Sequence, residues 1–235
     1  MPEVDIGALR AVASHLDAAG LNYAFTGGSV VNLLLDNPDM SKARPTKDVD
    51  VIVELLTGKR YSDVEAVLRE AKFSHDDSGG APICRWKLDK LVVDIMPTDG
   101  RLIGLNTEWF QEALETAKEI EYAHTRLRIV SPIGLLVTKY LTFTERGKGD
   151  YYASHDLEDF LTIVDGRERI VEEIDTSRTD MRGYLIKAFR SLLEQDEFND
   201  ALPGYLPPDS ASQARLPILR KKLKEVAGLI MTTSS

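Results

Sequence analysis

The sequence contains a single cysteine, Cys84, among its 235 residues, so no intramolecular disulfide can form. Chains without disulfides are typical of reducing compartments such as the cytosol. The four histidines are scattered along the chain and form no zinc-binding pattern with Cys84. The sequence therefore excludes a disulfide-stabilised fold and gives no sign of a zinc site.

Long apolar runs and an excess of positive charge are also missing. No run approaches the ~20 apolar residues that a membrane-spanning helix needs, and no N-terminal stretch has the basic head and apolar core of a signal peptide. We therefore expect a cytoplasmic protein without a membrane partner. The net charge is −9, with 38 acidic and 29 basic residues, which argues against a surface built for non-specific nucleic-acid binding. A local basic patch, and with it an RNA substrate, stays open.

Two acidic residues, Asp48 and Asp50, alternate with apolar residues in the sequence DVDVIV. Side chains two residues apart on a β-strand point to the same face, so this pair presents two carboxylates side by side. Hard cations such as Mg²⁺ take oxygen ligands and commonly share them with substrate phosphates. A glycosyltransferase metal motif has the same form, whereas an EF-hand is excluded because Val53 stands where glycine is needed. Taken alone, the pair can also be charged residues on an edge strand.

A glycine turn precedes this strand and suits a phosphate group. Gly27 and Gly28 lack a Cβ atom, so a ligand can approach their backbone closely. We expect Ser29 to be the N-cap of a helix that ends near Asp36, and the N–H groups of a helix N-terminus bind anions. The turn and the strand together predict a site for a metal-bound triphosphate. The alternative is an ordinary strand-to-helix turn.

A third carboxylate, Asp94, lies within the apolar run LVVDIM. We expect this run to be the second strand of a hairpin that turns at Asp89-Lys90. A carboxylate in such surroundings costs free energy unless it is paired or bound to a metal. Asp94 is therefore the third candidate ligand, and the alternative is a strand residue whose face is open to water.

These residues resemble a known signature. Gly27-Gly28-Ser29 followed by Asp48-Val49-Asp50 is similar to the pattern of the DNA polymerase β-like nucleotidyltransferase superfamily, whose third carboxylate Asp94 would match. The run RPTKDVD at 44–50 resembles the Arg-x-Thr-x-Asp-x-Asp variant of abortive-infection toxin nucleotidyltransferases, and residues 131–167 resemble their helical segment. The resemblance covers roughly residues 20 to 170.

The resemblance implies an enzyme that transfers a nucleoside monophosphate from a nucleoside triphosphate (NTP) to a hydroxyl acceptor and releases pyrophosphate. It implies two Mg²⁺ ions, or Mn²⁺, bound by the three carboxylates, which would be both the catalytic and the metal-binding residues. It also implies that Asp156 and Asp159 orient Lys139 or close the cleft. The residues that it places on the nucleotide are Gly27, Gly28, Ser29, Arg44 and Lys139. Without the resemblance, Lys139 can be a lysine at the rim of a helix, and Arg44 a solvated loop residue.

The acceptor stays open between several classes. The resemblance favours a toxin of a toxin–antitoxin or phage-defence system, with RNA, the ends of tRNA or a protein as acceptor and a cognate antitoxin as partner. An antibiotic-modifying nucleotidyltransferase is the alternative, and a non-catalytic nucleotide-binding module is a third. The basic final helix favours RNA, although such a helix is most often only a solvated face.

The predicted fold is α+β: a mixed β-sheet flanked by helices, followed by a C-terminal helical domain. After Ser131-Pro132, a strong helix start, the pattern is only helical, so we predict a catalytic domain at 1–130 and a helical domain at 131–235. The predicted strands are 23–26, 48–54, 83–88, 91–96 and a hairpin within 119–130. The predicted helices are 3–19, 29–36, 61–72, 107–118, 132–145, 154–165, 167–175, 179–194 and 212–230.

Overall fold

The computed structural model describes residues 6–38, 44, 46–56, 59–101, 104–146 and 150–231. The chain divides into two compact units. The α/β unit contains Pro2–Leu33 and Arg44–Gly134, and the helical unit contains Leu34–Ala43 and Leu135–Ser235. Each unit is defined by the contacts among its own residues, and this does not show that it folds independently. The domains predicted at 1–130 and 131–235 therefore stay a prediction.

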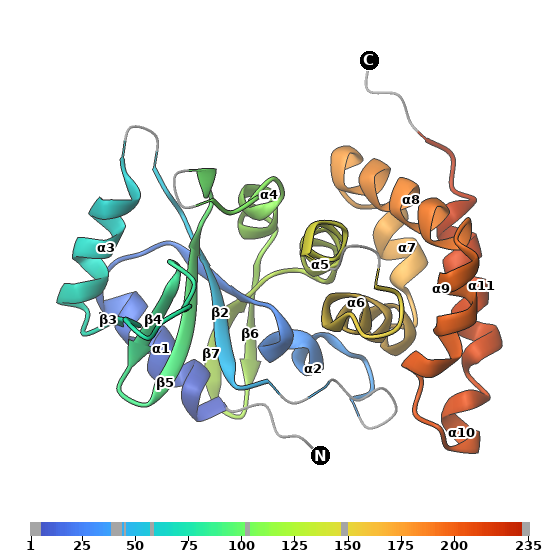
Figure 1. Cartoon of the computed structure of the whole chain (residues 1–235), viewed down its shortest axis with the longest axis horizontal. Helices are drawn as coiled ribbons and strands as arrows, with labels where there is room; N and C mark the ends of the chain where they lie inside the picture. Colours follow the sequence, from blue (N-terminus) through green and yellow to red (C-terminus); the bar gives the residue numbers. More distant parts are fainter. Residues whose placement is uncertain are drawn as a thin grey trace. The chain divides into compact units, whose positions relative to one another are not determined.

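A mixed sheet of seven strands forms the α/β unit, in the order β3-β4-β5-β2-β1-β7-β6 (Figure 1). The two central strands β1 and β2 are antiparallel to each other, whereas β2 runs parallel to β5 and β1 runs parallel to β7. The predicted α+β fold with a mixed sheet is thereby confirmed. The strands are β1 (Tyr23–Thr26), β2 (Asp48–Val53), β3 (Ser74–His75), β4 (Arg85–Leu88), β5 (Leu91–Pro97), β6 (Lys118–Tyr122) and β7 (Thr125–Ile129).

The core of the α/β unit lies along these central strands. Val51, Ile52 and Val53 of β2 are fully buried, as are Val93 and Ile95 of β5. Strands covered on both faces read as nearly continuous apolar runs, and a polar side chain in such a run therefore needs a specific partner. The helices of this unit are α1 (Ile6–Ala18), α2 (Val31–Leu34), α3 (Tyr61–Glu70) and α4 (Phe110–Glu115), with a 3₁₀ turn at Gly28–Val30.

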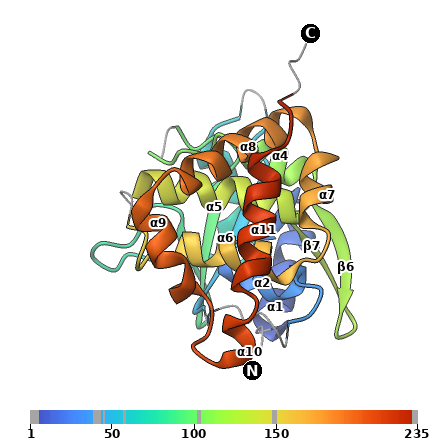
Figure 2. The same cartoon turned by 90° about the vertical axis from the view of Figure 1, so that its right-hand side faces the viewer.

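The helical unit contains α6 (His155–Gly166), α7 (Ile170–Asp175), α8 (Thr179–Leu193), α9 (Asp196–Ala201), α10 (Ser210–Gln213) and α11 (Leu216–Ala227), with most of α5 (Pro132–Arg146). Figure 2 shows α11 in front, where it packs against α6, α7 and α8. Leu219, Leu223 and Val226 of α11 are buried. The Lys222 ammonium donates hydrogen bonds to three carbonyls at the end of α6. One of the basic residues of the final helix thus serves packing within the unit.

Several predicted elements differ in length from the observed ones. The predicted hairpin strand 83–88 begins only at Arg85, and α4 is shorter than the predicted 107–118. The sequence analysis missed β3 and α9, which are only two and six residues long. Elements this short carry too few residues for a periodic pattern to show. In the part of the chain that the structure describes, no helix has the length and hydropathy of a membrane span.

Candidate functional site

The three predicted carboxylates come from neighbouring strands of the sheet. In the parallel pair β2–β5, Asp50 lies directly beside Asp94, and Asp48 lies beside Val92. Residues in register across a sheet point to the same face, and so do residues two apart on one strand. All three carboxylates therefore project from one face. Asp94 is buried, whereas the other two are half-buried.

A basic residue that the sequence analysis did not single out, Arg85, lies among these carboxylates. Its guanidinium donates from Nε and Nη2 to the two oxygens of Asp94, at 2.8 and 2.7 Å. The same Nη2 lies 3.4 Å from Oδ2 of Asp48. The hydrogen bonds to Asp94, and then the charges of both aspartates, raise the pKa of Arg85, so it stays charged. We call Arg85, Asp48, Asp50 and Asp94 the strand cluster.

The position of Arg85 follows from a signal present in the sequence. The turn at Asp89-Lys90 pairs Leu88 with Leu91, and counting back along the antiparallel strands pairs Arg85 with Asp94. Cross-strand partners on one face lie close enough for an ion pair. The expectation that Asp94 needs a partner was therefore sound, and the hairpin register identifies that partner.

Thr46 orients the first carboxylate of the motif. Its hydroxyl donates a 2.7 Å hydrogen bond to Oδ1 of Asp48. This contact gives a structural role to the threonine of the Arg-x-Thr-x-Asp-x-Asp pattern. Arg44 is only partly buried, and the structure leaves its predicted contact with a nucleotide as a prediction.

Gly27 fixes the position of Asp50. It has φ +69°, in the left-handed region that favours glycine. A Cβ atom added there would lie 1.9 Å from Oδ2 of Asp50, so the carboxylate packs directly on the glycine backbone. No side chain can occupy position 27 while Asp50 stays in place. The glycine turn and the carboxylate strand, predicted as separate halves of one site, therefore touch.

The turn itself differs from the predicted helix start. Gly27, not Ser29, is the N-cap, and a 3₁₀ turn over Gly28–Val30 precedes the short helix α2. The Ser29 hydroxyl donates to the carbonyl of Thr26 at 3.1 Å. The predicted N-cap role of Ser29 was therefore wrong, because its side chain closes the turn back onto β1. The first N–H groups of a 3₁₀ turn still lack partners within that turn.

Lys139 belongs to a second ion cluster, within the helical unit. Its ammonium lies 2.9 Å from Asp156 and 2.7 Å from Asp159. Both aspartates come from the start of α6, where Ser154 is the N-cap and accepts a hydrogen bond from the Leu157 N–H. We call Lys139, Asp156 and Asp159 the helix cluster. Its aspartates hold the lysine in place, and its contact with a triphosphate stays a prediction.

The donor chemistry of the strand cluster suits a hard divalent ion, since three carboxylates share one face of the sheet. Within the described ranges, however, no three His, Cys, Asp or Glu side chains are arranged to hold a metal ion. The Arg85 guanidinium instead pairs with both oxygens of Asp94 and with one of Asp48. The residue types thus match Mg²⁺ or Mn²⁺, and Arg85 now neutralises part of their charge.

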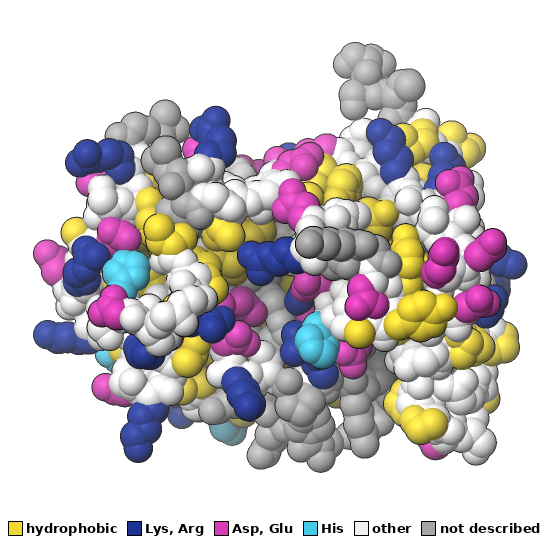
Figure 3. All heavy atoms as spheres, in the orientation of Figure 1, with side chains coloured by type: hydrophobic (Ala, Val, Ile, Leu, Met, Phe, Trp, Pro, Cys, Tyr) yellow, Lys and Arg dark blue, Asp and Glu magenta, His cyan; other side chains and the backbone are white. Residues whose placement is uncertain are grey.

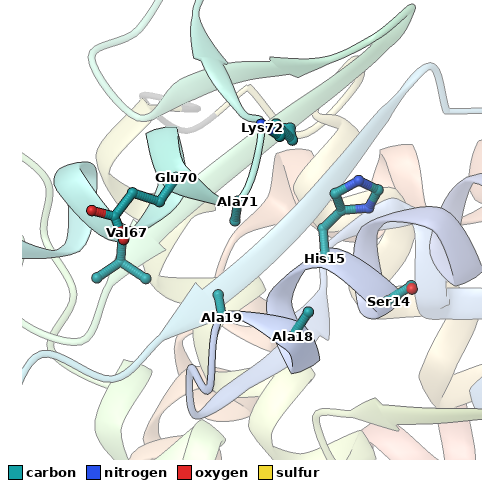
Figure 4. A pocket seen from close by; sticks show the side chains of 8 residues that line it. All are labelled: Ser14, His15, Ala18, Ala19, Val67, Glu70, Ala71 and Lys72. Carbon is teal, nitrogen blue, oxygen red and sulfur yellow. The ribbon is translucent and has the colours of Figure 1, made fainter.

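The described part of the chain also forms a cavity apart from the strand cluster. A cavity of about 500 Å³ lies between the end of α1 and the end of α3, lined by His15, Glu70 and Lys72 among others (Figure 4). It contains none of the predicted site residues. On the face shown in Figure 3, basic and acidic side chains are interspersed. This distribution agrees with the overall charge of −9.

No family model matches this chain, and no curated protein matches it. Solved structures do resemble it. An antigenic nucleotidyltransferase-like protein from Paracoccidioides brasiliensis is 18% identical with a TM-score of 0.47, and the match covers 93% of this chain and 91% of that one. The antibiotic-resistance factor ANT(2'')-Ia in solution is 14% identical with a TM-score of 0.48, over 81% of this chain and 94% of the other. A crystal structure of ANT(2'')-Ia with adenylyl-2''-tobramycin is 13% identical with a TM-score of 0.43, over 68% and 88%.

Proposed function

We propose that this protein is a metal-dependent nucleotidyltransferase. One observation supports the proposal most strongly: Asp50 lies in register with Asp94 while its carboxylate packs on the Gly27 backbone. An isolated Asp-x-Asp pair on an edge strand would need neither a third carboxylate beside it nor a glycine beneath it. Carboxylates can hold the metal ions that assist transfer of a phosphate-linked group, and a glycine turn lets a phosphate approach the backbone closely.

Each carboxylate of the strand cluster has a role in the proposed reaction. The acceptor hydroxyl attacks the α-phosphorus of the NTP, the bond to the β-phosphate oxygen breaks, and pyrophosphate leaves. Asp48 and Asp50 would hold Mg²⁺ or Mn²⁺, and Asp94 would complete the set, orient the acceptor hydroxyl and accept its proton. The bound ions would stabilise negative charge on the attacking and leaving oxygens. The N–H groups of Gly28 and Ser29 would bind the leaving pyrophosphate, and much of the rate would come from positioning.

The proposal also gives two basic residues a role in nucleotide binding. Arg44 and Lys139 would bind the triphosphate, as the family resemblance implies. The helix cluster gives Lys139 two carboxylates that restrict its rotamers. A lysine held in this way loses little further entropy when it binds a phosphate.

For the acceptor, we propose RNA, tRNA ends or a protein, in a toxin that a cognate antitoxin would restrain. The charge of −9 favours instead a small or cationic acceptor. Nucleotidylation of a hydroxyl on an antibiotic is therefore the second candidate. Toxicity on expression would support the toxin, and drug resistance the second candidate.

Incubation with each α-³²P-labelled NTP tests the proposal. Reactions would contain Mg²⁺ and, in turn, total RNA, cell protein or an aminoglycoside. We expect Asp50→Asn to lower label transfer by at least about 10³-fold, because several kcal/mol of metal-based stabilisation is lost. Asp99→Asn is the control, since Asp99 is an exposed partner of Arg101 in the same unit.

Two results would contradict the proposal. One is label transfer by Asp50→Asn at the level of the unchanged protein. The other is magnesium-dependent NTP binding without transfer to any acceptor, which would indicate a non-catalytic nucleotide-binding module.

A further inference from the structure

Arg85 occupies an unusual place for a residue next to a predicted metal site. Its guanidinium bonds both oxygens of Asp94, the most buried carboxylate of the strand cluster, and also approaches Asp48. A planar guanidinium matches a carboxylate with two parallel hydrogen bonds, which is among the stronger polar contacts in proteins. The single positive charge of Arg85 is thus shared between two of the three predicted metal ligands.

A divalent ion and this guanidinium compete for the same charge. The ion needs oxygens of Asp94, and Arg85 puts a fixed positive charge within 3 Å of them. Like charges at a partly buried site repel strongly, since the effective dielectric constant is lower than in water. Without Arg85, the adjacent Asp50 and Asp94 would repel each other and favour any cation that reached them.

The side chain of Arg85 can also move away from Asp94 toward solvent. Its side chain is 28% exposed, and Arg85 is the first residue of β4. The strand next to β4 at the edge of the sheet is β3, which has only two residues. A long side chain at the start of a strand can rotate toward solvent without disturbing the core strands.

We propose that Arg85 is a resident counter-cation of the strand cluster, which a divalent ion must displace from Asp94. This inference rests on the proposed function, since it concerns the same carboxylates. The displaced guanidinium would then lie beside the site with its donors available to phosphate oxygens. Metal binding would be weak in the absence of nucleotide and would strengthen when phosphates accept the guanidinium.

The test is the affinity for Mn²⁺ without nucleotide, measured by electron paramagnetic resonance on the full chain. We expect Arg85→Gln to bind Mn²⁺ at least about tenfold more tightly than the unchanged protein, because a competing charge a few ångströms away is removed. Arg85→Lys keeps the charge and should stay within about threefold. Lys87→Gln is the matched control: it removes the same charge from the same strand, where Lys87 pairs with Asp76 at 2.6 Å, and it should change the affinity by less than about twofold.

A second measurement follows Arg85 itself in the unchanged protein, and a variant serves only to assign its signal. Nitrogen–proton spectra of the arginine Nε–H groups would be recorded with Mg²⁺ and a non-hydrolysable NTP analogue, with Arg85 assigned from the spectrum of Arg85→Lys. We expect the Arg85 signal to move when both are added, because its bond to Asp94 is lost. An unmoved signal, or an Arg85→Gln variant that binds Mn²⁺ no more tightly, would overturn the inference.

The two proposals can fail separately. If Arg85→Gln tightens Mn²⁺ binding but no acceptor is ever labelled, Arg85 is the counter-cation of a metal site, and the proposed transferase activity is contradicted. If transfer depends on Asp50 while the Mn²⁺ affinity of Arg85→Gln is unchanged, the enzyme stands and Arg85 is only a structural ion-pair partner.

Discussion

Each unit of this molecule places one basic side chain between aspartates, and the two clusters differ in burial. In the strand cluster the side chain of Arg85 is 28% exposed, whereas in the helix cluster that of Lys139 is only 10% exposed. Asp159, which contacts Lys139, is 1% exposed. The strand cluster is thus more open to solvent than the helix cluster, in which only Asp156 is exposed to a similar degree, at 26%.

The difference teaches what each cluster can do. A closed ion pair cannot exchange its partner without leaving a charge stranded in the interior, which is costly. It is therefore suited to fixing α5 against the start of α6. A partly open ion pair can exchange one cation for another at low cost, because water solvates the displaced group. The strand cluster is suited to exchanging one cation for another, and the helix cluster to keeping Lys139 in a fixed position.

The largest expected effect comes from removing an aspartate from each cluster. Asp159→Asn should lower the free energy of unfolding by about 3 kcal/mol, because Lys139 stays buried with one carboxylate fewer. Asp94→Asn should cost less than about 2 kcal/mol, because the loss of its bonds to Arg85 is offset by relief of repulsion with Asp50. Urea unfolding followed by circular dichroism, with a chelator present, measures both. Equal costs would remove the distinction between the clusters.

A glycine substitution tests how the strand cluster is positioned. Gly27→Ala should cost about 2 kcal/mol or more, because it combines a left-handed backbone with a clash against Asp50. Gly20→Ala is the matched control, since Gly20 has φ +67° and a Cβ atom added there would meet no atom within 4 Å, and it should cost about 1 kcal/mol. Thermal unfolding gives the stabilities. If the two variants were equally stable, the contact between Gly27 and Asp50 would not constrain the carboxylate.

The smallest effect concerns the ion pair of Lys87 and Asp76 in the α/β unit, whose side chains are 42% and 9% exposed. The hydrogen bond from Lys87 holds the pKa of Asp76 at about 2, below its ordinary 3.8. A lowered carboxyl pKa stabilises the folded state above the unfolded pKa, and this stabilisation is lost as the pH falls through the folded pKa. The unfolding temperature of Asp76→Asn should therefore fall less than that of the unchanged protein between about pH 4 and pH 2. Parallel curves would show that this pair adds nothing to stability.

Local patterns predicted the elements near the site well. The strand at 23–26 was predicted with its observed bounds, and the helix that starts at Pro132 was predicted to within a residue at its end. The hairpin at Asp89-Lys90 was also predicted, and its register contained the Arg85–Asp94 pair. Each of these depends on residues adjacent in sequence, where turn chemistry and alternation act directly.

Elements that depend on distant contacts were predicted less well. The turn after β1 was expected to open a regular helix at Ser29, but the chain forms a 3₁₀ turn whose serine bonds back to Thr26. Asp50 of β2 packs on Gly27 in this turn, and that contact joins residues far apart in the sequence. Capping rules applied to the local sequence do not include such a constraint.

The sequence by itself determined which residues carry charge, which strands alternate, and that Asp94 needed a partner within an apolar run. Only the tertiary structure decided that Asp50 lies beside Asp94, because parallel strands are joined by long crossovers whose register depends on packing and not on a turn. It also decided that Arg85 of the strand cluster is more exposed than Lys139 of the helix cluster, since burial is a property of the whole fold.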